Sequence, residues 1–430
     1  MSSIFLFFGS NIEKNLYHGC MKIGINGRFL TLPYTGIGQY TAHLLQALAE
    51  QDSSVEYVVA IPSVIPNLKF QSNVRLILLP EKKFLPASLR KIVWEQIQVP
   101  RLFKKEKVAL AHYPYPANPR FPGGRAPKTI VTVHDVIPWI DPKHYQSRLR
   151  SRLLHSYIIK KALPKADHLI CVSQTTALAF SDHIQYPWRK ITVIHEAASP
   201  IFSQMLNVKK GSLNSRNSKK KDTESLRSLC LPYLLYVGGY DVRKNVLRLV
   251  EAYNAYIAPT YKVDLVLVGA KNLDNPYYTE LKSLQEILEA STIKRPSNPF
   301  LGKIRTTGYL PPETLAQYLQ NALGFVNFSL EEGFNLPLLE AAATSTPIVT
   351  SDIAIHREIL EESALFCDPK NIKSMGETLV HFLRDSALRE RLSATAHDLN
   401  SRYSWERAAQ ETLALYRQLV PFCHTEVLEV

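Results

Sequence analysis

Two glutamates, Glu332 and Glu340, stand eight positions apart where an apolar segment gives way to a turn and then to good helix formers. The segment 323–328 is predicted to be a buried strand, and Pro337 suits the first turn of the following helix. In an open α/β sheet, ligands bind at the carboxyl ends of the strands, and a helix N-terminus offers free N–H groups to a phosphate. A phosphate-binding site beside two carboxylates that can accept hydrogen bonds from sugar hydroxyls suits a nucleotide-sugar.

Glutamates at this spacing are also common on the surfaces of helices, where both carboxylates are solvated and carry no function. The two glutamates therefore indicate a ligand site only if the segments around them support it. Three other segments follow predicted strands and could contribute to a ligand site: residues 33–40, 132–135 and 238–245.

Four glycines lie in turns that lead from a predicted strand into a predicted helix: Gly36, Gly38, Gly238 and Gly239. A glycine turn at the start of a helix lets the backbone come close to a phosphate. A tight loop without a ligand explains the same residues, so the glycines alone do not decide between the two interpretations.

Arg243 and Lys244 stand side by side at the start of a predicted helix. Two cations at this place are unfavourable for the helix dipole, which suggests that an anion lies nearby. An arginine can form two hydrogen bonds to a diphosphate at once, and a lysine acts on it as a point charge. The alternative is a solvated basic surface.

His134 ends the predicted strand 129–134 in the middle of the first sheet, which places it at the edge of a cleft. A lone histidine is more often a structural residue than a ligand-binding one. We therefore consider a substrate contact for His134 only together with the other segments, and a general-base role is the less favoured of its functions.

Taken together, these segments resemble a known family. The spacing of Glu332 and Glu340 is that of the E-x7-E motif of retaining GT-B glycosyltransferases, glycosyltransferase family 4 in particular. The segment T-G-I-G-Q-Y at 35–40 resembles the T-G-I-G-R-Y opening of that family, and T-V-H-D at 132–135 resembles its T-x-H-D segment. The resemblance covers residues 21–200 and 231–420, in the right order.

The resemblance implies roles for individual residues. Glu332 would contact the hydroxyls of the donor sugar, and Glu340 the ribose hydroxyls. His134 would approach the donor sugar. The diphosphate would be held by the glycine turns, the two cations and the backbone N–H groups after Glu332, that is by Gly36, Gly38, Gly238, Gly239, Arg243, Lys244, Phe334, Asn335 and Leu336.

The chain departs from the family pattern at two of these positions. Gly239 stands where the family usually has an arginine, so we expect Arg243 to compensate. Asn335 replaces a frequent glycine, and asparagine tolerates a positive φ better than most residues. The segment 343–347 also lacks the glycine that the family often has before the proline. The changes at Asn335 and in segment 343–347 remove no charged group.

Alternating strand and helix patterns predict doubly wound parallel sheets. By resemblance the fold is α/β of the GT-B type: two Rossmann-like domains face each other across a cleft, and a C-terminal helix crosses back to the N-terminal domain. We expect an extension without an assigned role (1–20), an N-terminal Rossmann-like acceptor domain (21–200), a basic polar linker or insertion (201–230), a C-terminal Rossmann-like nucleotide-sugar-binding domain (231–402), and the crossing helix with the tail (403–430).

The individual elements follow from hydrophobic periodicity. Strands are predicted at 22–26, 55–61, 74–79, 109–113, 129–134, 168–172, 191–195, 233–237, 263–268, 304–306, 323–328 and 348–350. Helices are predicted at 37–50, 87–104, 147–163, 174–183 and 245–257, and the segment 372–420 is predicted to be helical in three pieces.

Composition sets further bounds. The 430 residues are 46% apolar and 21% charged, which is typical of a globular protein of two or three domains. No run of 18 apolar residues occurs, so no transmembrane helix is expected. The five cysteines are scattered without a C-x-x-C pair, which fits a reducing cytosol rather than a disulfide framework or a zinc site.

The net charge of +13 lies entirely in the first half. Residues 1–200 hold 25 Lys and Arg against 12 Asp and Glu, and residues 201–430 hold 26 of each. A one-sided basic surface favours an anionic partner. The predicted basic amphipathic helix at 147–163 is typical of a membrane-surface element, and equally of an ordinary helix packed on the sheet.

We therefore predict a retaining, metal-independent hexosyltransferase. It would move a sugar, with mannose favoured, from a nucleotide-diphosphate sugar (GDP-mannose or a UDP-sugar) to a hydroxyl of a glycan or lipid-linked saccharide in polysaccharide biosynthesis. No bound cofactor is expected, and no D-x-D motif at a strand end implies a metal. The expected location is cytoplasmic or peripheral on the inner face of the membrane.

Other classes of protein stay open. One is a catalytically silent GT-B partner subunit, and another is a protein that binds anionic membranes or nucleic acid. No recognition helix, RNP-type segment or zinc spacing supports nucleic-acid binding, so none is expected. A nucleotide-sugar epimerase would be distinguished by consumption of the donor without an acceptor.

Overall fold

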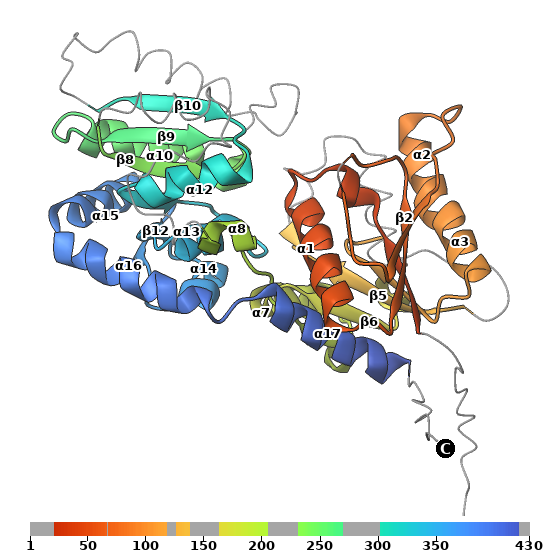
Figure 1. Cartoon of the computed structure of the whole chain (residues 1–430). Coiled ribbons are helices and arrows are strands. Elements are labelled where there is room, and N and C mark those ends of the chain that lie inside the picture. Colours follow the sequence, from red (N-terminus) through yellow and green to blue (C-terminus); the bar gives the residue numbers. More distant parts are fainter. Residues whose placement is uncertain are drawn as a thin grey trace, which may run out of the picture.

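Runs of apolar residues that are buried on both faces form the central strands of two parallel sheets. The computed structural model describes residues 21–66, 68–117, 126–137, 163–204, 231–269 and 302–420. These residues fold into two α/β domains that lie next to each other (Figure 1).

The N-terminal domain holds a seven-stranded sheet of order β3-β2-β1-β4-β5-β6-β7, with every neighbouring pair parallel. The strand order reverses between β1 and β4, so a crevice opens at the carboxyl ends of these two strands. The strands are β1 (Lys22–Asn26), β2 (Glu56–Ile61), β3 (Val74–Leu78), β4 (Leu110–Tyr113), β5 (Lys128–Val133), β6 (His168–Cys171) and β7 (Ile191–Val193).

The C-terminal domain holds a six-stranded parallel sheet of order β10-β9-β8-β11-β12-β13. Its strand order reverses between β8 and β11. The strands are β8 (Tyr233–Val237), β9 (Asp264–Val268), β10 (Ile304–Gly308), β11 (Gly324–Asn327), β12 (Ile348–Ser351) and β13 (Leu365–Cys367).

Helices connect the strands and cover the sheets. The N-terminal domain contains α1 (Gly36–Gln51), α2 (Ala87–Val93), α3 (Val99–Lys105) and α7 (Gln174–Ile184). The short helix α8 (Pro200–Gln204) follows them and lies against the helices of the C-terminal domain (Figure 1). The C-terminal half contains α10 (Val246–Ala252), α12 (Pro312–Asn321), α13 (Leu336–Ala343), α14 (Ala354–Leu360), α15 (Ile372–Arg384), α16 (Ser386–Asn400) and α17 (Trp405–Leu419). Short helical turns lie at Arg28–Thr31, Leu163–Lys165, Trp188–Lys190 and Val242–Lys244.

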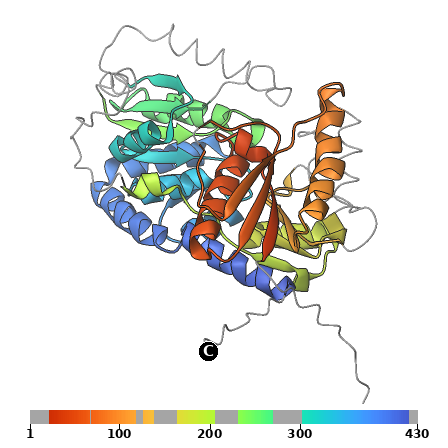
Figure 2. The ribbon, with the colours of Figure 1, turned by 45° about the vertical axis from the view of Figure 1, so that its right-hand side comes forward.

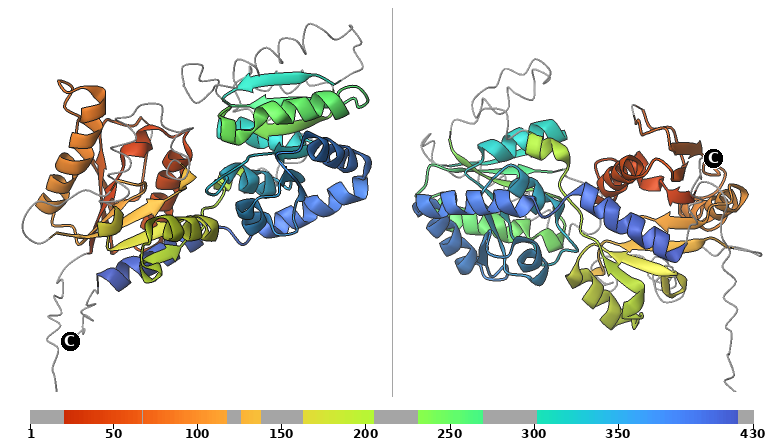
Figure 3. Two further views of the ribbon diagram at one scale, coloured as in Figure 1. Left: turned by 180° about the vertical axis from the view of Figure 1, so that it is seen from behind. Right: turned by 60° about the horizontal axis from the view of Figure 1, so that its bottom comes forward.

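The last of these helices, α17, leaves the C-terminal domain and lies against α1, as Figures 1 and 2 show. Seen from below in Figure 3, it spans from one domain to the other. Trp405 Nε1 donates to the Ala198 carbonyl at 3.1 Å, and the Tyr416 hydroxyl lies 2.6 Å from His112 Nδ1. The predicted GT-B fold with a crossing C-terminal helix is therefore confirmed.

Two predicted helices are not continuous. The predicted helix 87–104 contains a π-helical turn at Trp94–Gln98 between α2 and α3. The wider turn accompanies the burial of Trp94, whose Nε1 donates to the Leu79 carbonyl at 2.5 Å. The predicted helix 245–257 likewise ends in a π-helical turn, at Tyr253–Ile257.

Several predictions lie outside the described residues: the extension 1–20, the helix 147–163 up to residue 162, and positions 205–230 of the linker. Residues 201–204, which were assigned to the linker, belong to α8. The elements β13, α12 and α14 were not predicted from the sequence.

Removal of the Trp405 side chain should weaken the attachment of α17. Its ring is 4% exposed and packs against Tyr40 and His43. We expect Trp405→Ala to lower the free energy of unfolding by about 3–5 kcal/mol, the usual loss for a large buried aromatic side chain. Urea denaturation measures it.

Arg407→Ala is the matched control, because Arg407 lies on the same helix in an exposed ion pair with Glu411. Its effect should stay within about 0.5 kcal/mol. Equal denaturation midpoints for both variants would show that the indole contacts contribute nothing to stability.

Candidate active site

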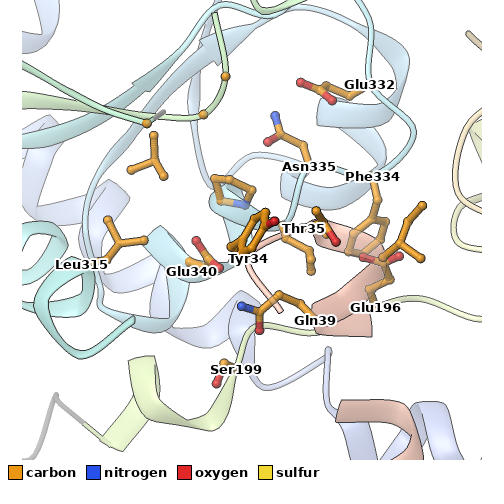
Figure 4. Close-up of a pocket in the computed structure, with 18 of the residues that line it drawn as sticks. Tyr34, Thr35, Gln39, Glu196, Ser199, Leu315, Glu332, Phe334, Asn335 and Glu340 are labelled. Carbon is orange, nitrogen blue, oxygen red and sulfur yellow. The ribbon is translucent and has the colours of Figure 1, made fainter. Parts of the chain in front are cut away.

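A cleft of about 750 Å³ separates the carboxyl ends of the two sheets. Its volume lies in the usual range for small-molecule sites. Eleven of the twelve residues predicted for the site line it: Gly36, His134, Gly238, Gly239, Arg243, Lys244, Glu332, Phe334, Asn335, Leu336 and Glu340. Figure 4 shows Glu332 and Glu340 apart from each other, with Asn335 between them.

The twelfth residue, Gly38, does not line the cleft. Its N–H donates to the hydroxyl of Thr35, which caps α1, at 3.1 Å. A Cβ at this position would lie 2.2 Å from the Leu32 carbonyl oxygen. Close packing of the backbone therefore accounts for this glycine, whereas Gly36 borders the cleft and has open space around it.

Glu332 lies in the loop after β11 and is held by two cations. Lys244 Nζ donates to its Oε1 at 2.5 Å, and Arg243 Nη1 donates to its Oε2. The Ser329 hydroxyl adds a third bond at 2.8 Å. Burial would raise the pKa of Glu332, but the two cations outweigh burial and lower it to about 2.

The two cations follow β8, which is the sheet neighbour of β11, so sheet order brings them to Glu332. Lys244 is almost completely buried, and burial lowers its pKa although the carboxylate of Glu332 opposes this. Arg243 also pairs with Asp241, with 3.2 Å between Nε and Oδ1. The structure therefore places Arg243 and Lys244 beside Glu332 in the cleft. Their contact with a diphosphate stays a prediction.

Asp135 also lines the cleft and was not assigned a role from the sequence. Burial raises its pKa, and the positive charges of Arg243 and His134 oppose that rise. Asp135 belongs to the T-V-H-D segment, which already marked this loop as part of a site. Only the structure shows that Asp135 is close enough to interact with Arg243.

The loop between Glu332 and α13 presents backbone N–H groups. Asn335 has φ +82°, and its Nδ2 donates to His356 Nε2 at 2.9 Å, which fixes this left-handed conformation. Within the part of the chain that the structure describes, the N–H groups of residues 334–336 donate to no protein acceptor. Three such N–H groups at the start of a helix can bind a phosphate.

Glu340 lies on α13 and lines the cleft in a different environment from Glu332. Burial raises its pKa to about 7. Among the described residues, no side chain or N–H group is bonded to its carboxylate. Both oxygens are therefore available to accept bonds from hydroxyls of a ligand.

His134 stands at the cleft edge, but both of its ring nitrogens face protein acceptors. Nδ1 lies 2.8 Å from Glu196 Oε1, and Nε2 lies 2.8 Å from the Pro114 carbonyl oxygen. Burial would lower the pKa of His134, but these two bonds raise it above its usual value. An imidazolium held in this way has no lone pair for a general base. A contact of His134 with a donor sugar stays a prediction.

Glu196 follows β7 and lines the cleft (Figure 4), and its carboxylate contacts His134. No sequence motif marked this residue, because its position in the cleft depends on the fold around a three-residue strand.

The glycines at the ends of β8 and β9 allow their loops to approach closely. A Cβ on Gly269 would lie 1.9 Å from the Gly238 carbonyl oxygen, and one on Gly238 would lie 2.7 Å from the Tyr236 hydroxyl. At the cleft, the exposed rings of Tyr34 and Tyr309 meet edge to face with 6.4 Å between centroids. These rings come from different domains.

Two parallel-sheet domains that face each other across such a cleft, with a crossing helix, define the GT-B class of glycosyltransferases. Residues 34–199 match the family model "Glycosyltransferase Family 4", and residues 231–385 match "Glycosyl transferases group 1". Together these matches cover more than half of the chain. The protein belongs to glycosyltransferase family 4.

Curated relatives match over most of their length. "O-antigen chain mannosyltransferase B" of Escherichia coli is 25% identical over 416 residues, which cover 93% of this chain and 100% of the relative. "O-antigen chain mannosyltransferase RfbU" of Salmonella typhimurium is 22% identical over 357 residues, which cover 79% of this chain and 85% of the relative.

Solved structures share the fold. Sucrose-phosphate synthase from Thermosynechococcus elongatus matches with a TM-score of 0.68 at 20% identity, over 93% of this chain and 99% of the other. WaaG, described as a glycosyltransferase involved in lipopolysaccharide biosynthesis, matches with a TM-score of 0.66 at 14% identity, over 92% and 99%.

The described residues lack two features, a membrane-spanning helix and a group of metal ligands. No helix there has the length and apolar character needed to span a membrane. The same residues contain no group of three or more potential metal ligands.

The raised pKa of Glu340 predicts a pH-dependent effect on stability. An ordinary glutamate in the unfolded chain ionises near pH 4.5, whereas Glu340 in the folded protein ionises near 7. Stability is therefore lost as pH rises from 4.5 to 7, because only the unfolded chain releases the proton readily. Glu340→Gln removes this loss, so we expect the variant to be more stable at pH 8 by up to about 3 kcal/mol.

Urea denaturation at pH 4.5 and pH 8 measures the difference. The gain should vanish at pH 4.5, where the carboxyl group is protonated in the folded wild type. A difference between variant and wild type that does not change with pH would contradict the assignment.

Proposed function

We propose that this glycosyltransferase moves a mannosyl residue from GDP-mannose to a hydroxyl of a saccharide or lipid-linked saccharide during polysaccharide biosynthesis. The observation that carries the proposal is the cluster of Arg243, Lys244 and the unbonded N–H groups of residues 334–336, gathered in one cleft. Mannose and the polysaccharide context are supported by the names of the two O-antigen mannosyltransferases that match 93% and 79% of the chain.

In this proposal the donor diphosphate lies between the two cations and the N-terminus of α13. The cations that bind Glu332 in this structure have further N–H donors that can turn to phosphate oxygens. Glu340 accepts bonds from the ribose hydroxyls, and Glu332 from hydroxyls of the donor sugar. Gly36, Gly238 and Gly239 let the backbone approach the diphosphate.

The chemistry required of the protein is stabilisation of the leaving diphosphate. Negative charge grows on the β-phosphate as the glycosidic bond breaks, and preorganised cations and N–H groups stabilise it most in that state. Neutralisation by Arg243 and Lys244 suits a metal-independent reaction. The nucleotide-sugar serves as co-substrate, and no resident cofactor is proposed.

Retention of the anomeric configuration is proposed to follow a front-face displacement. Glu332 is a poor nucleophile, because two cations stabilise its charge and hold its pKa near 2. A donor phosphate oxygen would instead take the proton of the acceptor hydroxyl as that hydroxyl attacks the same face. His134 is unsuited to this proton transfer because both its nitrogens are engaged.

A donor panel tests the proposal. Thermal shifts with GDP-mannose, UDP-glucose, ADP-glucose and dTDP-glucose should show the largest rise in Tm with GDP-mannose. Glu340→Gln should lose that rise, although the variant is more stable without ligand. No rise with any of these donors would overturn the proposed function.

Lys244→Ala should lower kcat of mannosyl transfer by about 10²–10³, since it removes a charge that acts on the leaving group. Lys303→Ala, an exposed cation of the same domain, is the control and should leave kcat unchanged. Proton NMR of the product gives its anomeric configuration, and a β-mannoside from the α-linked donor would exclude retention.

We also propose peripheral attachment to the inner face of an anionic membrane, through the N-terminal domain. The helix 147–163 that first suggested it lies outside the described residues. Support comes from the outer edge of the domain at α2 and α3 (Figure 1), where Phe84 is 81% exposed. Exposed cations lie before and along α2 and α3, and we call this set the basic edge: Lys82, Lys83, Lys91, Arg101, Lys104 and Lys105.

Vesicle sedimentation tests the attachment. Lys82→Glu with Lys83→Glu should weaken binding to phosphatidylglycerol vesicles at least tenfold, because each basic residue contributes about 1 kcal/mol at an anionic surface. Lys370→Glu with Arg391→Glu makes the same charge change on the exposed surface of the other domain and should have little effect. Equal binding by both variants would contradict a role for the basic edge.

A further inference from the structure

The N-terminus of α7 is capped by a carboxylate from the other domain. The first N–H groups of a helix have no partner within it and need an outside acceptor. Glu358 of α14 supplies one: its Oε1 accepts from the Gln174 N–H at 2.6 Å, and its Oε2 accepts from the Thr175 N–H at 2.8 Å. The Thr175 hydroxyl also donates to Glu358 Oε2 at 2.6 Å. His195 Nε2 lies 3.2 Å from Glu358 Oε1.

The same turn of α7 holds the loop that carries Glu332. The Ser173 hydroxyl donates to the Gly333 carbonyl at 2.8 Å, and the Thr176 hydroxyl donates to the same oxygen at 3.1 Å. Ser173 also caps its own helix, since its Oγ accepts from the Thr176 N–H at 3.0 Å. Gly333 directly follows Glu332, so these bonds fix the peptide beside the carboxylate.

The other side of this loop also touches the N-terminal domain. A Cβ on Gly333 would lie 1.8 Å from the His134 carbonyl oxygen and 2.7 Å from the Asp135 Cβ. Residues 331–335, which we call the Glu332 loop, are therefore held between two segments of the opposite domain. Only glycine allows this approach.

We propose that Glu358 is a positioning residue that couples closure of the two domains to the geometry of the Glu332 loop. α7 and α14 face each other where the domains meet (Figure 1). Of the bonds described above, all cross that boundary except the Ser173 cap, which lies within α7. Separation of the domains would leave two helix N–H groups and the Gly333 carbonyl without these partners.

The charge of Glu358 favours this coupling at neutral pH. Burial would raise its pKa, but the bonds from His195, Thr175 and Gln174 lower it below the usual value. The carboxylate is therefore ionised when it meets the positive end of the helix dipole. The Glu332 loop would reach its full order only in the closed arrangement, in which the cleft holds donor and acceptor together.

The inference rests on the proposed function for its effect on catalysis, but its effect on domain closure can be measured independently. Small-angle X-ray scattering of Glu358→Ala should give a larger radius of gyration than the wild type. Glu358→Gln keeps one carbonyl acceptor and should be intermediate. Glu362→Gln, an exposed glutamate just after the same helix, is the control and should scatter like the wild type.

Kinetics supply the second readout. Glu358→Ala should lower kcat of sugar transfer by about tenfold to a hundredfold, as expected for a misplaced catalytic group. The Kd for GDP should change by less than about threefold, since the proposed nucleotide contacts other than Gly36 come from the C-terminal domain. Partial recovery of kcat in Glu358→Gln is expected.

Each outcome bears on the proposal. An unchanged radius of gyration together with unchanged kcat in Glu358→Ala would overturn it. A parallel loss of GDP binding and kcat would show a merely structural role and also overturn it. If the wild type transfers no sugar, the proposed function fails, while the scattering comparison still decides whether Glu358 holds the domains together.

Discussion

A carboxylate buried between an arginine and a lysine is the constraint on which the cleft depends. Burial of Glu332 alone would be strongly unfavourable, and so would burial of Lys244 without it. The three groups come from loops after β8 and β11, which lie side by side where the strand order reverses. The ion pairs therefore fix the two loops relative to each other at the place where open α/β sheets bind ligands.

The two glutamates of one motif show how environment divides chemical roles. Glu332 is stabilised as an anion by Arg243 and Lys244, whereas Glu340 is half-buried and no described residue is bonded to its carboxylate. Burial alone favours the neutral form of a carboxyl group, and adjacent positive charge favours the ionised form. Identical side chains eight residues apart thus differ in pKa by several units within one cleft.

Sequence reasoning predicted the fold and eleven of the residues that line the cleft, from local patterns together with the resemblance to a family. Buried strands alternating with helices give parallel sheets, and residues at the carboxyl ends of those strands then meet. Asn335 could also be predicted, since its left-handed conformation is one that asparagine tolerates.

What could not be predicted depends on contacts between distant segments. The ring nitrogens of His134 are engaged by Glu196 and Pro114, neither of which is near it in sequence. Gly38 follows a cleft residue in the motif, yet the carbonyl of Leu32 explains it. The π-helical turn at Trp94–Gln98 follows the burial of a tryptophan against the end of β3, which periodicity does not reveal.

The contact between α1 and α17 joins segments that are more than 350 positions apart in the chain. On a ribosome, α1 is made early, but the helix that covers it emerges only after both sheets have been synthesised. Until then the apolar face of α1 beside Tyr40 and Leu44 lacks its cover. Because closure of so long a loop is slow, the N-terminal domain should spend much of its synthesis as an incomplete, chaperone-accessible intermediate.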